Sequence, residues 1–194
     1  MIYPLIWLAS SSLKPASQIF SDLSIVPRSL RFQNYVDGWR GAALPFSVFF
    51  TNSFIVAGLA VVGNVLACSL TAFAFARLNF AFKRTLFAIM MLTMMLPLHA
   101  VLIPQYALFF QLGWVNTYLP LVVPKFLATD AFFIFLMIQF IRGIPRELDE
   151  AATIDGADTF RIYYMIILPL MAPALITTAI FSFIWTYQDF LSPL

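Results

Sequence analysis

Long apolar stretches alternate along this chain with shorter segments that hold most of its charged residues. Residues 41–76, 85–124 and 162–188 contain no charged side chain. A helix needs about 20 apolar residues to cross the hydrocarbon core of a bilayer. Strands of a membrane β-barrel would instead show short segments of alternating polarity. The continuous pattern therefore predicts membrane-spanning helices at 53–76, 86–110, 119–140 and 167–187.

The first part of the chain has a different pattern. Residues 2–9 are apolar but too few to span a bilayer, and no basic residue precedes them, so they are not an ordinary signal peptide. They are either the remnant of a first membrane helix or a short interfacial segment, and the serines before Lys14, typical of a helix exit, favour the remnant. Residues 14–45 are more polar and predict a loop or small folded cap. The expected organisation is 1–13 remnant helix, 14–51 external cap and 52–194 membrane domain.

Composition narrows the class of protein. Hydrophobic residues make up 62% of the 194 residues and charged residues 10%, whereas a soluble domain carries about 45–50% and about 25%. A soluble enzyme is excluded, and a net charge of +2 offers no basic face for nucleic acid. One cysteine, Cys68, and one histidine, His99, cannot form a Cys/His metal cluster. The sequence indicates an all-α, polytopic integral membrane protein that holds no metal or cofactor of its own.

Basic residues in the short loops predict orientation. Segments 77–84 and 142–161 are rich in Lys and Arg, while 111–118 has none. Cytoplasmic loops carry the excess of basic residues, so the first two are expected in the cytoplasm, with 111–118 and 14–45 outside. Segment 14–45 also carries basic residues, which long translocated segments tolerate.

The loop at 142–167 carries the densest local signals. Pro145 suits the first position of a helix, and the acidic residues that follow it suit a helix N-terminus. Gly156 suits the positive-φ end of that helix, and Asp158 suits the N-cap of a second one. Two short helices are predicted. Small Ala151 and Ala152, with apolar Leu148 and Ile154, suggest a docking surface, although these local features leave a plain solvated loop equally open.

A spaced motif runs through the same loop. Its residues are Glu150, Ala151, Ala152, Gly156, Ile166, Leu168 and Pro169. This pattern resembles the EAA loop in the inner-membrane subunits of ABC importers. The resemblance extends over nearly the whole chain to the carbohydrate, maltose-type permeases, through Leu96-Pro97, Ile103-Pro104-Gln105-Tyr106 and Leu112-Gly113-Trp114-Val115-Asn116-Thr117-Tyr118.

The sequence also departs from that family. Residues 187–191 read Tyr-Gln-Asp-Phe-Leu where the family typically has Trp-Asn-Asp-Phe-Leu. The family has six spans, whereas this sequence predicts about four complete ones and a shortened first. The chain is accordingly expected to be a fragment at both ends.

The resemblance implies a type I ABC importer fold and a set of partners. These are a second permease subunit, two cytoplasmic ATP-binding subunits and an extracytoplasmic solute-binding protein. ATP and Mg would be bound by the ATPase subunits, and this chain has no Walker-type phosphate loop. Its first EAA-loop helix would dock in a cleft of the ATPase, with Glu150 making a polar contact and Gly156 the bend.

Two other classes of function fit the sequence less well. A membrane-embedded enzyme would need a catalytic constellation that the sequence lacks. A scaffold or sensor subunit would not explain the complete motif.

Polar residues on the predicted spans are candidates for contact with a solute. Lys125 and Asp130 lie within one apolar segment, where ionisable groups are a functional hint. On a continuous helix they would be roughly 140° apart, a poor geometry for a pair. Polar groups on spans more often bridge helices than bind substrate. The candidates are Asn64, His99, Gln105, Lys125, Asp130 and Asp189. The solute itself, whether disaccharide, oligosaccharide, polyol or glycerol phosphate, stays open.

Overall fold

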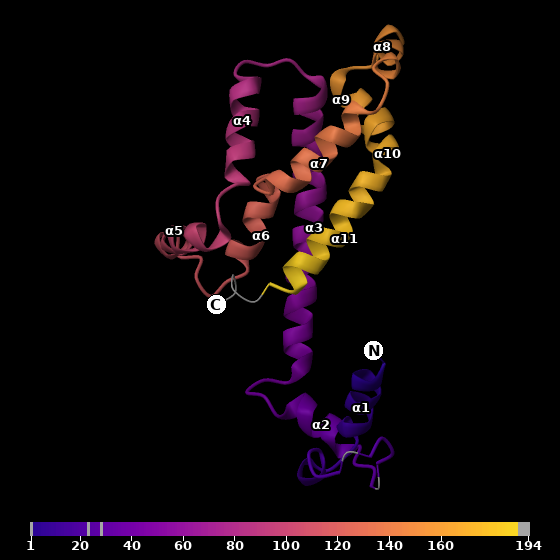
Figure 1. Ribbon diagram of the computed structural model, residues 1–194. Coiled ribbons are helices and arrows are strands. Elements are labelled where there is room, and N and C mark those ends of the chain that lie inside the picture. Colours follow the sequence, from indigo (N-terminus) through magenta and orange to yellow (C-terminus); the bar gives the residue numbers. More distant parts are fainter. Residues whose placement is uncertain (1, 23, 28, 190–194) are drawn as a thin grey trace. The chain divides into compact units, whose positions relative to one another are not determined.

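The structure is a computed structural model that describes residues 2–22, 24–27 and 29–189, apart from the side chains of Leu98 and His99. Every regular element in these ranges is helical (Figure 1), as the sequence predicts. The longer helices are α1 Tyr3–Ser12, α2 Gln33–Arg40, α3 Phe46–Arg77, α4 Lys83–Thr93, α5 Leu98–Gln111, α6 Leu119–Phe126, α7 Ala131–Arg142, α8 Glu147–Ile154 and α11 Ala172–Tyr187. Shorter ones are η1 Ala16–Gln18, α9 Thr159–Ile162, the π-helical η2 Tyr163–Ile167 and α10 Leu168–Leu170.

The chain forms two compact units, Met1–Ser53 and Phe54–Leu194. In the first unit, a buried lysine just after α1 joins the helix end to the segment that follows. The Lys14 side chain donates to the backbone carbonyls of Asp22 at 2.7 Å and Ser24 at 2.6 Å. Asn34 donates to the carbonyls of Ser12 and Lys14. Segment 14–45 is therefore folded onto the end of α1.

The core of the second unit lies where α3, α7 and the α9–α11 segment pack together (Figure 1). Small residues on α3, including Ala60 and Ala72, are fully buried, and such residues allow membrane helices to approach closely. Gly63 is one of them, because a Cβ there would lie 2.8 Å from the Phe126 ring. On the other side of the core, the Phe133 and Trp185 rings of α7 and α11 stack with centres 5.2 Å apart.

The expected single helix over 86–110 is wrong. The chain leaves helical geometry after Thr93 and re-enters it at Leu98. Pro97 has no N–H to donate, and it disfavours helical geometry at Leu96. Continuous hydropathy concealed this break.

The predicted spans at 119–140 and 167–187 are also interrupted. Ala128 has φ +54 between α6 and α7. The helical segment Thr159–Leu170 is bent by 74° against α11. Two helices, Phe46–Arg77 and Leu119–Arg142, are long and apolar enough to cross a membrane, or three if the bent pair counts as one span. By length and composition, the described residues thus hold two or three candidate spans, where the sequence predicts about four complete ones.

Candidate functional site

Two cap motifs shape the 142–167 loop. The backbone N–H of Gly156 donates to Thr153 O at 3.0 Å, and that of Ala157 donates to Ala152 O at 2.9 Å. Together they form the Schellman end of α8, with Gly156 at φ +81. Asp158 caps α9 through Oδ1, which accepts from the Arg161 N–H at 2.7 Å. The predicted pair of helices is confirmed, but Pro145 is not their first residue, because α8 begins at Glu147.

Helix α8 has two different faces. Asp149 and Ala152, three positions apart, point to the core side, and Ala152 is only 9% exposed. Glu150 and Ala151 are exposed, and Ile154 is 87% exposed. The idea that both alanines border a partner surface is therefore wrong for Ala152, which packs within the chain.

A buried ion pair holds α8 to the end of α3. Arg77 Nε lies 2.8 Å from Asp149 Oδ2, with side chains 6% and 19% exposed. The same guanidinium donates to the backbone carbonyl of Ile144 at 2.7 Å. An ion pair so far removed from water is costly to break from one side, so it fixes which face of α8 remains open.

The second half of the motif serves packing. Ile166 and Leu168 are partly buried against the core, and Pro169 is exposed. Between α9 and α10 the chain widens into a π-helix, a distortion that often marks functional positions. Its Tyr163 hydroxyl lies 2.8 Å from the Ser69 hydroxyl of α3, so the loop is tied to α3 at a second place.

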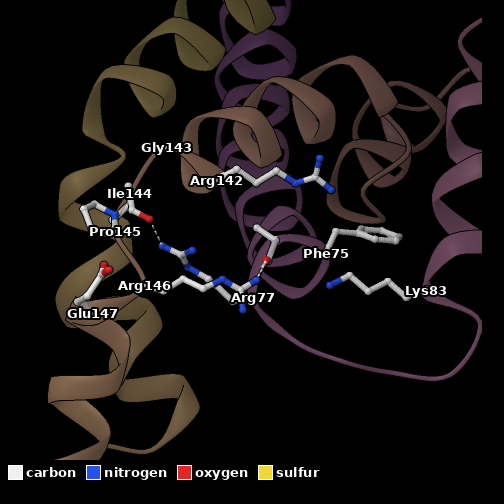
Figure 2. Close-up of a pocket in the computed structure, with 10 residues that line it drawn as sticks. Phe75, Arg77, Lys83, Arg142, Gly143, Ile144, Pro145, Arg146 and Glu147 are labelled. Carbon is white, nitrogen blue, oxygen red and sulfur yellow. Dashed lines mark hydrogen bonds between the residues drawn. The ribbon is translucent and has the colours of Figure 1, made fainter.

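A basic groove of about 650 Å³ lies beside the loop (Figure 2). It is lined by Phe75, Ala76, Arg77, Lys83, Arg142, Gly143, Ile144, Pro145, Arg146 and Glu147. Lys83 reaches it from the start of α4, and Arg146 reaches it from the other side (Figure 2). Burial lowers the pKa of Lys83, and the charges of Arg146 and Arg142 lower it further.

Lys125 and Asp130 do form a pair, with Nζ 3.0 Å from Oδ2. The expected poor geometry assumed a continuous helix, whereas the helix is broken between the two residues. Both side chains are more than a quarter exposed.

The other path candidates are dispersed. Asn64 is buried, and its Nδ2 donates to Ser182 Oγ at 2.9 Å, so it bridges α3 and α11. Gln105 is exposed on α5, and Asp189 is exposed just after α11. His99 belongs to α5, but its side chain lies outside the described residues. The candidates do not form one cluster among the residues that can be placed.

Sequence reasoning missed Arg77, Ser69 and Tyr163 as anchors of the loop. Their partners are 67 to 94 positions away in the chain, and no local spacing pairs residues so distant. Arg77 follows an apolar run in the sequence, but that position indicates only the orientation of the chain in the membrane.

The apolar helices define the class as an integral membrane protein, and its loop is anchored on one face and open on the other. Residues 63–194 match the family described as "Binding-protein-dependent transport system inner membrane component". The chain belongs to this family.

Relatives that are named as transport system permeases agree with that assignment. The chain is 33% identical to the trehalose/maltose transport system permease protein of Thermococcus litoralis, over 98% of this chain and 68% of the relative. It is 32% identical to the diacetylchitobiose uptake system permease protein of Streptomyces coelicolor, over 100% of this chain and 63% of the relative. The chain thus spans about two thirds of the length of these relatives.

A solved structure shares the fold. It is a bacterial ABC transporter involved in the import of the acidic polysaccharide alginate, with a TM-score of 0.84 and 24% identity. The match covers 95% of this chain and 64% of that one. The fold is therefore the helical bundle of ABC importer permeases.

Proposed function

We propose that this chain is a permease subunit of an ABC importer, that it lines the path of a carbohydrate or related polyol, and that its 142–167 loop couples the path to ATP hydrolysis. The observation that carries the proposal is the division of α8 into an anchored face and an open one. Asp149 and Ala152 hold the inner face, while Glu150, Ala151 and Ile154 face outward.

Coupling requires a rigid connection between a docking surface and the membrane helices. A partner that pushes on α8 would move the end of α3 through the Arg77–Asp149 pair. It would also move the π-helix and α11 through the Schellman turn and α9. A flexible solvated loop would absorb such a displacement, so the two anchors favour a docking role.

The proposal implies partners for this chain. A cytoplasmic ATPase receives α8, a second ATPase and a second permease subunit complete the membrane assembly, and an extracytoplasmic protein delivers the solute. ATP and Mg belong to the ATPase subunits. Segments 77–84 and 142–161 face the ATPase side, since both are basic and both adjoin the groove.

Carbohydrate is the proposed solute class because of the relatives' names. They include transport systems for diacetylchitobiose, trehalose/maltose and galactooligosaccharides. The pair Lys125–Asp130 is partly exposed and is the strongest candidate on the path for contact with a solute or with a facing helix.

The test replaces Glu150 with Ala and Gly156 with Val. Glu150→Ala removes a charge-assisted hydrogen bond of about 1.5–3 kcal/mol to the partner, and Gly156→Val places a β-branched residue at positive φ. Both variants should insert in the membrane yet lose ATPase co-purification and solute-stimulated ATP hydrolysis.

Asp158→Ala is the matched control. It removes only a helix cap, worth about 0.5–2 kcal/mol, and should retain substantial transport. Wild-type association and hydrolysis in both test variants would overturn the coupling role and favour a scaffold or sensor subunit.

A further inference from the structure

The basic groove holds more positive charge than its own acids balance. As the structure describes it, the lining has four basic residues and one acid, Glu147. Arg77 is neutralised by Asp149. The other three bases meet neutral groups: Lys83 donates to Leu78 O at 2.6 Å, Arg146 donates to Ala76 O at 3.4 Å, and Arg142 lies 5.8 Å from the centre of the Phe87 ring.

The residues that line the groove indicate its depth in the membrane. Two candidate spans, Phe46–Arg77 and Leu119–Arg142, both end in residues of this groove. The groove therefore lies where hydrocarbon gives way to water. Lipid phosphates occupy this level, and basic pockets between membrane helices there bind anionic head groups.

Two exposed apolar side chains lie close to Lys83 in the chain. Phe82 is 77% exposed in the turn before α4, and Leu86 is 47% exposed one turn further on. Aromatic side chains are enriched at the membrane interface. A ligand that spans both surfaces needs an anionic head and an apolar tail.

We propose that Lys83, Arg142 and Arg146 bind the phosphate of an anionic phospholipid, whose acyl chains run along Phe82 and Leu86. Burial lowers the pKa of Lys83 and the charges of Arg146 and Arg142 lower it further; a bound phosphate would offset that repulsion. The site uses none of the residues on the open face of α8, Glu150, Ala151 and Ile154, so it is distinct from the proposed docking surface. A free phosphate would satisfy the three bases but would leave the apolar surface uncovered.

Native mass spectrometry of the protein purified in detergent tests the site, with phosphatidylglycerol and phosphatidylcholine as probes. Wild-type protein should bind phosphatidylglycerol about a hundredfold more tightly, since each of the three basic residues near an anionic surface contributes roughly fivefold. The triple variant K83Q/R142Q/R146Q should lose this preference. The charge-matched control R31Q/R40Q/R161Q, whose three side chains are exposed outside the groove, should keep it.

A single variant tests the site even where the triple variant fails to fold. Arg146 is exposed and makes one long hydrogen bond, so Arg146→Gln should fold and weaken phosphatidylglycerol binding by about fivefold. Unchanged binding in this folded variant would overturn the proposal.

Two further results would also overturn it. Displacement of the lipid by millimolar inorganic phosphate would show a soluble-anion site. Loss of a co-purifying protein partner in the triple variant, with lipid preference intact, would show a protein interface. Loss of lipid preference with ATPase association intact would support the lipid site and leave the coupling role untouched.

Discussion

The 142–167 loop and the α4–α5 segment, two regions of one compact unit, are built in opposite ways. The loop contains charged and small residues, yet it packs against the core through Ala152, Ile162 and Ile167. The α4–α5 segment is far more apolar, yet none of its described side chains is fully buried. From hydropathy alone, the α4–α5 segment would be expected to be more buried than the loop, whereas the structure shows the opposite.

The comparison separates a membrane protein's apolar surface from its core. Lipid can cover the apolar side chains of α4 and α5, so these side chains need no packing partner within the chain. The loop, by contrast, is held in position by specific contacts with α3. Under the proposed function, a displacement of the docked loop would therefore be transmitted to the core, whereas the α4–α5 segment would tolerate it.

Removal of the Arg77–Asp149 ion pair should have the largest effect, because this pair holds the loop against α3. Arg77→Met leaves Asp149 with an uncompensated, mostly buried charge, and breaking such a pair costs about 3–5 kcal/mol. Amide hydrogen exchange should accelerate throughout α8. Arg31→Met is the matched control, because its pair with Asp37 is about half exposed at 3.6 Å and is worth about 0–1 kcal/mol. Equal acceleration of hydrogen exchange in the two variants would contradict an anchoring role for the Arg77–Asp149 pair.

Two positive-φ glycines, one in each region, allow a strain test. Gly156 has φ +81 and Gly113, just after α5, has φ +69, and a Cβ at either would meet open space. Valine at each position should cost about 1–3 kcal/mol through backbone strain alone. Gly156→Val should impair ATPase co-purification and Gly113→Val should spare it. A matching loss from both would assign the effect to general instability.

Neighbouring alanines test the two faces of α8. Ala152→Leu should overpack the core and lower the free energy of unfolding by about 1–3 kcal/mol. Ala151→Leu, on the open face, should change it by no more than about 0.5 kcal/mol. Thermal unfolding in detergent measures both, and a reversed order would mean that the helix is rotated.

The smallest effect is expected in the α4–α5 segment. Pro97→Ala changes the residue that ends the break, where no described side chain of α5 is buried. Stability should shift by no more than about 0.4–1 kcal/mol, mainly through the unfolded chain. A larger loss in the same thermal assay would show that this break is held by tight packing.

Local signals explain why the sequence predicted some features and missed others. Gly156 and Asp158 act on neighbouring backbone groups, so the two loop helices could be predicted. The break at Pro97 was obscured by apolar residues on both sides. The Lys125–Asp130 pair depends on a helix break at Ala128, and the Arg77–Asp149 anchor joins residues far apart in the chain, so no local spacing reveals either one. The family motif located the loop but did not distinguish its buried alanine from its exposed one.

Cross-linking from the open face of α8 tests the central claim most directly. A cysteine replaces Ile154, which is 87% exposed, in a Cys68→Ala background, and the assembled transporter is treated with a short bifunctional thiol reagent. Gly113→Cys, after α5, serves as the comparison position. The account predicts a cross-link between position 154 and the ATPase subunit, and none from position 113. A cross-link from position 113 with none from position 154 would contradict it.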